Sequence, residues 1–234
     1  MVLLATPHLR FHRSFLAAAD EIRAAGQEVH DGIVNWPAEA DFPGVVFTRD
    51  GLEDSAEFAR LVANRVGDAE ESSPRPPGWT PSTHWWMADP HQPDEFVGAI
   101  SLRHSIDHPM LASVGGHIGY GVRPSARRRG FAGDALRQVI PLAAARGIPR
   151  LLVTCDLDNV ASARTIEANG GELEGELRGK RRYWITTGAG PVRTRDRSRR
   201  HRLTRAAARP ENRCRPRPAL PVRRPCHRAR RRVP

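Results

Sequence analysis

Between Gly116 and Thr154 the chain reads as a strand, a helix and a second strand in direct succession, and this order leaves few folds open. The strand Gly116–Val122 runs through Pro124 into an Arg- and Gly-rich turn, and the helix Ala132–Ala145 follows. Leu151–Thr154 is then a short, continuously apolar run, typical of a strand that is covered on both faces. The sequence therefore predicts that a parallel strand pair lies in this part of the sheet.

The other elements follow from hydrophobic periodicity and from turn residues. Helical spacing predicts a helix over Ser14–Ala25 and a second one that begins near Asp54, which caps it while Glu57 reaches back. Strands are expected at Thr83–Ala88 and Phe96–His104, and with Gly116–Val122 they are predicted to be antiparallel neighbours. A later helix is expected at Asn159–Ala168, followed by two closing strands at Leu173–Leu177 and Arg182–Thr186. The order indicates an α/β fold with a mixed sheet.

The formal net charge of +11 is concentrated at one end of the chain. Residues 188–234 carry 17 arginines against two acidic residues, a local charge of +15, which leaves −4 for residues 1–187. Because this Arg- and Pro-rich segment has no periodic apolar residues, it is predicted to be disordered. Three interpretations stay open for it: binding of nucleic acid through phosphate contacts, a solvated tail, or a translated wrong reading frame.

The cysteines and the apolar runs limit the cellular compartments in which the protein is expected. Cys155, Cys214 and Cys226 are odd in number and widely spaced, which argues against a disulfide framework and against a metal site. The longest apolar run near the N-terminus, Val2–Ala5, is too short for a signal sequence, and no stretch approaches the roughly 20 apolar residues of a membrane span. We therefore expect a cytoplasmic protein without a membrane partner.

The stretch His117–Gly133, HIGYGVRPSARRRGFAG, has the design of an anion site. A helix N-terminus presents unpaired backbone N–H groups and the positive end of the helix dipole, and Gly130 lets the main chain approach a phosphate closely. Arg127, Arg128 and Arg129 add charge that pairs with further phosphates. Taken alone, the same turn is also compatible with solvated arginines and no ligand.

The turn is part of an ordered set of motifs. Arg127-x-x-Gly130-x-Ala132 follows the strand, and Asn159-Val-Ala-Ser162 opens the helix after the buried strand. Over about Trp85–Ile185 the set resembles the GCN5-related N-acetyltransferase (GNAT) family, above all its predicted bacterial acetyltransferases with GGHIGYGVRPSxRRRG, LVTCDxDNVAS and IExNGG segments. The resemblance implies the GNAT fold, a mixed and mostly antiparallel central sheet with a splayed parallel strand pair and flanking helices.

The resemblance also implies a domain plan and a binding site. Residues 1–187 would form the acetyltransferase domain, with an N-terminal helical part at 1–78 and an acetyl-CoA-binding core at about 85–185, followed by the tail at 188–234. For Asn159, capping of its helix is a second, compatible role. The residues expected to bind acetyl-CoA are Tyr120, Gly121 and Val122 at the pantetheine arm, Arg127, Arg128, Arg129, Gly130, Phe131, Ala132 and Gly133 at the pyrophosphate, and Asn159 and Ser162 at the thiol end.

Catalytic residues are harder to assign. Acetyl transfer needs a neutral amine, so a base or a water chain must remove a proton. His117 is the first candidate for this base, although a structural role is equally open for it. His104 is the second candidate and Glu95 the third. Many family members have a Tyr seven residues after the Asn, whose hydroxyl protonates the CoA thiolate. This chain has Ile166 there, and the nearest hydroxyl on the same helix is that of Ser162.

Several aromatic and thiol side chains have two interpretations each. Trp79, Trp85 and Trp86 line an acceptor pocket or pack in the core, and since adjacent strand residues face opposite ways, at least one is expected in the core. Tyr183 is a proton donor or a packing residue, with packing favoured. Cys155 ends an apolar strand and is expected to be buried rather than nucleophilic.

The sequence thus predicts an acetyl-CoA-dependent N-acetyltransferase that acetylates a primary amine of a small molecule or protein directly, within a ternary complex. The acceptor itself is not identified, and a monomer or a homodimer is expected. Two alternatives come from other classes: a catalytically silent CoA-binding regulatory module, because of Ile166, and a nucleic-acid-binding protein that works through the Arg-rich tail.

Overall fold

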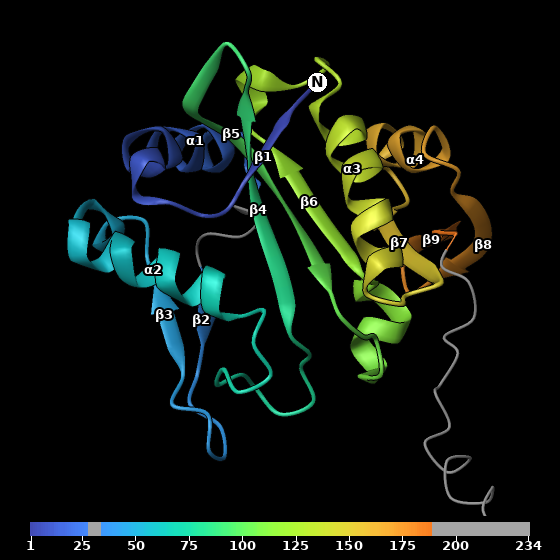
Figure 1. Ribbon diagram of the computed structural model, residues 1–234, viewed down its shortest axis with the longest axis horizontal. Helices are drawn as coiled ribbons and strands as arrows, with labels where there is room; N and C mark the ends of the chain where they lie inside the picture. The colour runs from blue at the N-terminus through green and yellow to red at the C-terminus, as the bar shows by residue number, and fades with distance from the viewer. Residues whose placement is uncertain (28–33, 189–234) are drawn as a thin grey trace, which may run out of the picture. The chain divides into compact units, whose positions relative to one another are not determined.

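The structure is a computed structural model that describes residues 1–27 and 34–188 (Figure 1). The predicted tail at 188–234 lies outside the described residues, except for Gly188. In chain order the helices and strands are β1 (Leu3–Ala5), α1 (His12–Ala24), β2 (Val34–Trp36), β3 (Val45–Phe47), α2 (Ser55–Gly67), β4 (Ser82–Asp89), β5 (Gln92–Arg103), β6 (Ile118–Val122), α3 (Phe131–Ala145), β7 (Arg150–Asp156), α4 (Val160–Glu167), β8 (Glu172–Leu177) and β9 (Lys180–Thr186).

The main sheet has seven strands in the order β1-β4-β5-β6-β7-β9-β8. Every neighbouring pair in it is antiparallel except β6 and β7, which are parallel. The predicted α/β fold with a mixed, mostly antiparallel sheet is therefore confirmed. The crossover from β6 to β7 runs through α3, as the strand–helix–strand order predicted.

The N-terminal part differs from the helical segment expected at 1–78. Its first strand, β1, pairs with β4 at the edge of the main sheet, and β2 and β3 form a separate two-stranded sheet. These strands have three residues each, too few for a period-two pattern to stand out from a loop. At α2, Asp54 caps the helix as predicted, whereas Glu57 pairs with Arg60 instead of reaching back.

Helices cover both faces of the sheet (Figure 1). Beneath α1 and α2, an aromatic core gathers Phe15, Phe58 and Trp86, with Phe15 and Trp86 stacked at 5.1 Å between ring centroids. Beneath α3 and α4 the core is mainly aliphatic. Alternation along β4 sends Trp86 into the first core and Trp85 toward the second, so both pack against a core, one of the two roles left open for them.

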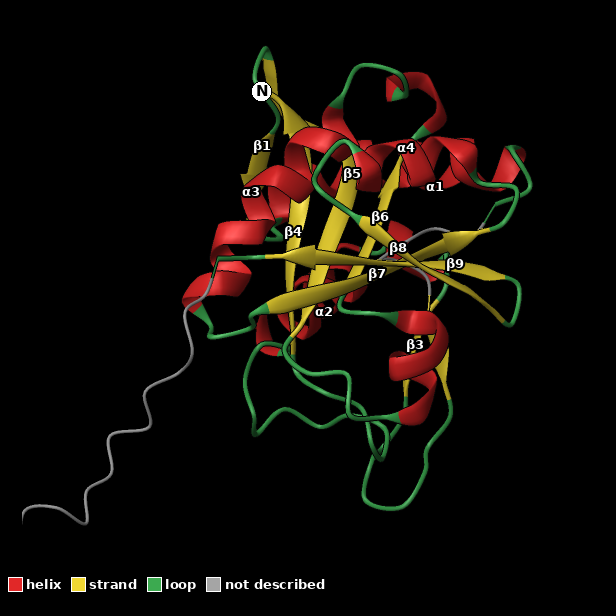
Figure 2. Cartoon of the chain, turned by 90° about the vertical axis from the view of Figure 1, so that its right-hand side faces the viewer, coloured by secondary structure: helices red, strands yellow, loops and turns green. Residues whose placement is uncertain are grey.

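The parallel strands β6 and β7 pair at one end and are not paired at the other. β6 and β7 pair only at Ile118 and Val153, and Figure 2 shows β7, β8 and β9 running across the direction of β4, β5 and β6. At the paired end Gly116, with φ of +64°, comes so close to β7 that a Cβ would lie 2.6 Å from the Leu152 carbonyl oxygen. Beyond Ile118 no residue of β6 pairs with β7, so the edge of β6 that faces away from β5 has no strand partner there.

Within residues 1–27 and 34–188, no helix combines the length and apolarity that crossing a bilayer requires.

Candidate functional site

The turn between β6 and α3 has the backbone of an anion site. Gly130 precedes α3 with φ of +81°, a left-handed conformation that favours glycine, and no side chain caps the helix there. A Cβ on Gly130 would meet no heavy atom within 4 Å, so the space in front of the helix is open. The first-turn amides of a helix have no intrahelical acceptor, and at the N-cap of α3 no side chain accepts from them.

The three arginines of the turn are not equivalent. Arg127 donates from Nε to the Val122 carbonyl at 3.0 Å and also contacts Gln27, while Arg129 pairs with Asp89 and lies over the Phe131 ring. Arg128, with φ of +60°, is exposed and makes no ion pair within the described part of the chain. Arg128 is therefore the arginine most available to a further phosphate.

Two hydroxyl groups, one from β6 and one from α4, are in hydrogen-bond contact. The Tyr120 hydroxyl lies 2.8 Å from Oγ of Ser162. Burial raises the pKa of Tyr120 to about 12, so its phenol keeps its proton at neutral pH. Burial also raises the pKa of the Cys155 thiol, whose side chain is only 5% exposed, as expected for a buried cysteine. Tyr120 was predicted to contribute through its backbone, and the structure shows that its hydroxyl also contacts Ser162.

The start of α4 agrees with the capping role proposed for Asn159. Its Oδ1 accepts a hydrogen bond from the Ser162 amide at 3.0 Å, which leaves the carboxamide N–H₂ end for other contacts. Ile166, one turn after Ser162, is fully buried in the aliphatic core. A hydroxyl at position 166 would have to enter this core, so the departure from the family pattern matches the packing.

His117 is held as a structural residue. It is 6% exposed, its amide donates to the Leu152 carbonyl, and its Nδ1 accepts from the Leu152 amide at 2.9 Å. Burial, with a smaller effect of Arg103, lowers the pKa of His117 to about 4. The ring is then neutral at pH 7 with its lone pair already bonded, which favours the structural role that the sequence left open.

His104 lies on the α3 side of the sheet. Its Nε2 is 2.8 Å from the Thr83 hydroxyl, and Arg146 at the end of α3 contacts both side chains. Burial and the charge of Arg146 lower the pKa of His104. The third candidate, Glu95, is engaged with the buried Arg123, and Tyr183 is buried with its hydroxyl on Glu167.

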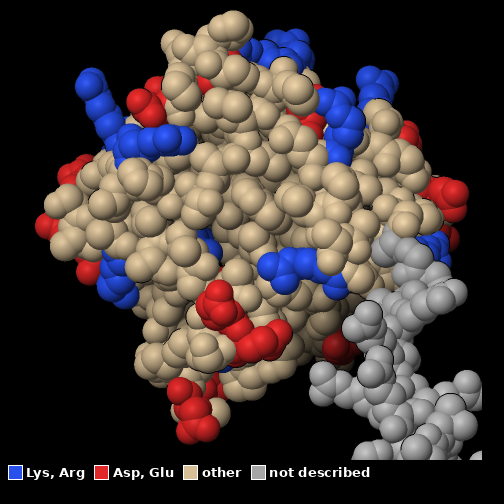
Figure 3. All heavy atoms as spheres, viewed as in Figure 1, with Lys and Arg blue, Asp and Glu red and all other residues tan. Residues whose placement is uncertain are grey.

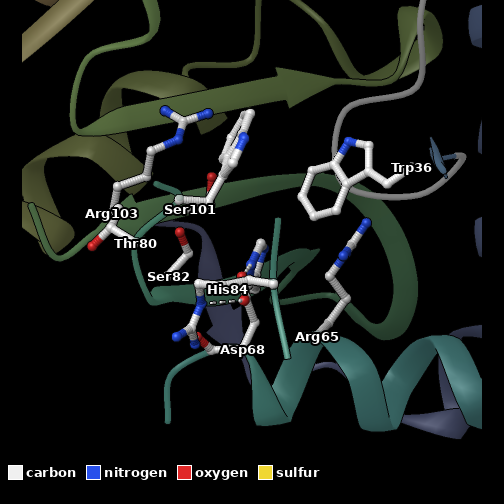
Figure 4. Close-up of a pocket in the computed structure, with 10 residues that line it drawn as sticks. Trp36, Arg65, Asp68, Thr80, Ser82, His84, Ser101 and Arg103 are labelled. Atoms are coloured by element: carbon white, nitrogen blue, oxygen red, sulfur yellow. Dashed lines mark hydrogen bonds and ion pairs between the residues drawn. The ribbon is translucent and has the colours of Figure 1, made fainter. Parts of the chain in front are cut away.

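A pocket of about 150 Å³ opens on the opposite face, the face covered by α2 (Figure 4). Its floor is formed by β4 and β5, and an aromatic wall is formed by Trp36 and Trp79, with ring centroids 5.2 Å apart. Trp79 thus lines a pocket, whereas its predicted role in acceptor binding stays a prediction. The lining residues are Trp36, Arg65, Asp68, Arg75, Trp79, Thr80, Ser82, His84, Ser101 and Arg103.

Sequence reasoning missed most of this pocket. One contact within the pocket joins Nε2 of His84 to Oδ2 of Asp68 at 2.9 Å. The only local signal is alternation, since His84 shares a strand face with Ser82 and with the buried Trp86. No pattern in the sequence pairs His84 with Asp68, because the two lie on different elements.

The described surface is mixed in charge on the face seen in Figure 3. Lys and Arg side chains are scattered over this face among Asp and Glu. This distribution agrees with the net charge of −4 that the sequence assigns to residues 1–187.

Solved structures of acetyltransferases share this fold. The chain is similar to RimJ from Mycobacterium smegmatis in complex with CoA-disulfide, at 17% identity and a TM-score of 0.52, over 79% of this chain and 81% of that one. It is also similar to the microcin C7 self-immunity acetyltransferase MccE in complex with acetyl-CoA and AMP, at 15% identity and a TM-score of 0.51, over 79% and 92%. A third is RimL, a ribosomal L7/L12 α-N-protein acetyltransferase, in complex with CoA. It is 18% identical with a TM-score of 0.50, over 81% of this chain and 96% of that one.

These identities are low and show the fold alone. No curated protein is similar enough in sequence to count as a match. The sequence model of the family described as "Acetyltransferase (GNAT) domain" matches residues 33–172, more than half of the chain. The match confirms the resemblance seen in the motifs, and the chain therefore belongs to the GNAT family of acetyl-CoA-dependent acetyltransferases.

Proposed function

We propose that this protein transfers the acetyl group of acetyl-CoA directly to a primary amine of a small molecule or protein, within a ternary complex. The observation that carries the proposal is the N-terminus of α3 after β6, which no side chain caps and where a Cβ on Gly130 would meet no heavy atom within 4 Å. A pyrophosphate is the ligand that suits such a helix end, because it accepts from several backbone amides at once. Arg128 supplies an exposed positive charge beside it.

The edge of β6 without a strand partner suits the pantetheine arm. β6 is paired along one edge with β5, whereas along the other edge it meets β7 only at Ile118. The backbone of Tyr120–Val122 therefore has one edge without a strand partner, where the Val122 carbonyl accepts from Nε of Arg127. The amides of an extended pantetheine chain bond to this edge as an added strand would. Asn159 and Ser162 lie beside this edge at the start of α4, where the thiol end is proposed to lie.

The proposed reaction needs two proton transfers. The amine must lose a proton before its nitrogen attacks the carbonyl carbon, and the departing thiolate must gain one as the C–S bond breaks. Tyr120 and Ser162 form a hydroxyl pair near the proposed thiol end, so they serve the second transfer directly or through water. Because a thiolate is a good leaving group, the contribution of this pair is expected to be modest.

The test has two stages. Calorimetry measures binding of acetyl-CoA, and a thiol-release assay over an amine panel, with mass detection of products, then seeks the acceptor. RimL is described as an α-N-protein acetyltransferase, so the panel includes peptides with a free α-amino group. Release of CoA with formation of an acetylated amine supports the proposal. Tight binding without turnover on any amine would favour the silent CoA-binding module instead.

A cytoplasmic location belongs to the same proposal and is supported by the odd number and wide spacing of the three cysteines in the sequence. RNA binding by the tail remains a separate prediction, because residues 189–234 lie outside the described structure. Comparison of salt-dependent RNA binding by the full chain and by residues 1–187 tests it.

A further inference from the structure

A buried arginine at the end of β6 joins three parts of the fold. Arg123, the residue after β6, is 8% exposed, and its guanidinium donates to two carboxylates, that of Glu21 in α1 and, at 2.6 Å, that of Glu95 in β5. It also donates to the Phe96 carbonyl at 3.2 Å. A buried charge is stable only where it is paired and hydrogen-bonded, so these contacts fix the arginine in one place. They connect α1 and β5 to the start of the turn between β6 and α3.

Glu21 also binds the main chain of that turn. Its Oε1 accepts from Nε of Arg123 at 3.1 Å, while its Oε2 accepts from the Ser125 amide at 3.2 Å. Ser125 lies in the short 3₁₀ turn Pro124–Ala126, which leads directly into Arg127. The hydrogen bond from Arg123 lowers the pKa of Glu21 from 4.5 to about 2, so the carboxylate is charged at neutral pH. One side chain of α1 therefore holds both the arginine and the backbone where the turn begins.

The next part of the turn, where the pyrophosphate is proposed to bind, needs such support. Arg128 has φ of +60° and Gly130 has φ of +81°, so both are left-handed. A residue with a side chain keeps this conformation only where the surrounding contacts over-determine it. On the far side of Arg128, Arg129 pairs with Asp89, whose side chain is 6% exposed. On the near side lie the contacts of Glu21.

We propose that Glu21 is a positioning residue for the acetyl donor, because it holds the β6–α3 turn in the conformation that accepts the pyrophosphate of acetyl-CoA. This inference rests on the acetyl-CoA site proposed above. Glu21 itself does not touch the ligand, since its carboxylate is bonded to Arg123 and Ser125 and repels phosphate. It acts through the fraction of molecules whose turn is competent to bind, and the apparent affinity falls with that fraction.

Asp20, the neighbour of Glu21 on α1, provides a matched control. Its two carboxylate oxygens accept from Arg49 at 2.8 and 2.7 Å, and its side chain is 42% exposed, compared with 31% for Glu21. Arg49 also pairs with Glu53, so this ion pair connects α1 to the segment before α2 rather than to the β6–α3 turn. Alanine, the best helix former, removes one ion pair from the same helix at either position.

Calorimetry of the full chain compares the two variants, with thermal melts as the check that both are folded. If the turn without Glu21 is competent for about one-tenth of the time, Glu21→Ala raises the Kd for acetyl-CoA about tenfold. Asp20→Ala should leave this Kd unchanged. S-acetylpantetheine, which has no pyrophosphate, should bind to both variants as it binds to the wild type.

A general loss of structure would not separate these variants and ligands. An unchanged Kd for acetyl-CoA in Glu21→Ala overturns the proposal, and so does an equal loss in Asp20→Ala. An equal loss of affinity for acetyl-CoA and S-acetylpantetheine in Glu21→Ala also overturns it. If S-acetylpantetheine binds too weakly to titrate, the comparison with Asp20→Ala decides alone.

Glu21→Gln replaces Glu21→Ala if the alanine variant does not fold, with Asp20→Asn as its control. Glutamine keeps an oxygen for the Ser125 amide but loses the charge that faces Arg123. Its Kd for acetyl-CoA should therefore rise by a smaller factor than in Glu21→Ala. A Kd equal to that of Asp20→Asn would refute the positioning role.

Amide hydrogen exchange in the free protein separates this inference from the acetyl-CoA site itself. The amides of Ala126 and Arg127 donate within the turn, to the carbonyls of Arg123 and Pro124. They should exchange faster in the Glu21 variants and not in the Asp20 variants, because the turn opens more often. Unchanged exchange overturns the proposal. If the wild type binds no acetyl-CoA, the function proposed above fails, whereas binding that does not depend on Glu21 refutes the positioning role alone.

Discussion

Gly130→Asp and Gly130→Asn differ by a single negative charge and test the anion site at the start of α3. The backbone at Gly130 has φ of +81°, and Asn and Asp adopt this conformation more readily than other side chains do. Since a Cβ there meets no heavy atom within 4 Å, both variants should fold, with a shared cost of about 1 kcal/mol from the left-handed backbone. The difference between them then reports the charge alone.

The size of that difference follows from Coulomb's law. With an effective dielectric constant of about 40 for this exposed turn, a carboxylate about 5 Å from one phosphate charge costs about 1.7 kcal/mol. The two charges of a pyrophosphate double this to about 3 kcal/mol, and screening at physiological salt removes about half of it. The Asp variant should therefore bind acetyl-CoA about 10- to 100-fold more weakly than the Asn variant.

Calorimetry of both variants at low and at physiological salt measures the effect, with thermal melts as the check on folding. The ratio of the two Kd values should shrink as salt is added, because the repulsion is electrostatic. If the folded Asp and Asn variants bind acetyl-CoA equally well at low salt, the pyrophosphate does not lie in front of α3 and the proposed site is wrong.

Three further predictions concern stability, the leaving thiolate and the tail. The hydrogen bond from Arg123 lowers the pKa of Glu21 from 4.5 to about 2, so this ion pair stabilises the fold above about pH 4.5 and its contribution is lost as the pH falls toward 2. Glu21→Gln should thus lower Tm by a few degrees at pH 7, about 1–2 kcal/mol after solvent screening, and melts of the two proteins should converge near pH 2. Ser162→Ala should cost about tenfold or less in kcat, with Tyr120 and water still present; a loss of several hundredfold with intact acetyl-CoA binding would make Ser162 an essential acid. A chain that ends at Gly188 should keep the Tm and the acetyl-CoA affinity of the full chain, and a clear drop in either would show that the tail contributes to the fold.

Local patterns were sufficient for most elements around the proposed acetyl-CoA site. The helix predicted at Ala132–Ala145 is α3, and the apolar run Leu151–Thr154 lies within β7. Both depend on residues close in sequence: a stripe at helical spacing, and a run of apolar residues between turn signals. The Gly130 turn could be found for the same reason, since the glycine and the arginines are neighbours in the chain.

Short edge elements were not predictable in this way. β1 has three residues and becomes a strand because β4 offers it hydrogen bonds, 80 or more residues later in the chain. Its sequence alone is equally compatible with a loop. The β2–β3 hairpin of three-residue strands escaped prediction for the same reason.

The roles of the histidines were decided by tertiary structure. The sequence placed the His117 imidazole on the strand before the Arg-rich turn. Only the tertiary structure, in which β7 comes close to this strand, shows that Nδ1 of His117 accepts from the Leu152 amide. His84 and Asp68 meet because the register of β4 and the end of α2 place them 2.9 Å apart. Local periodicity reports which face a side chain takes, whereas hydrogen-bond partners, burial and charge depend on chain segments that come together only when the sheet is assembled.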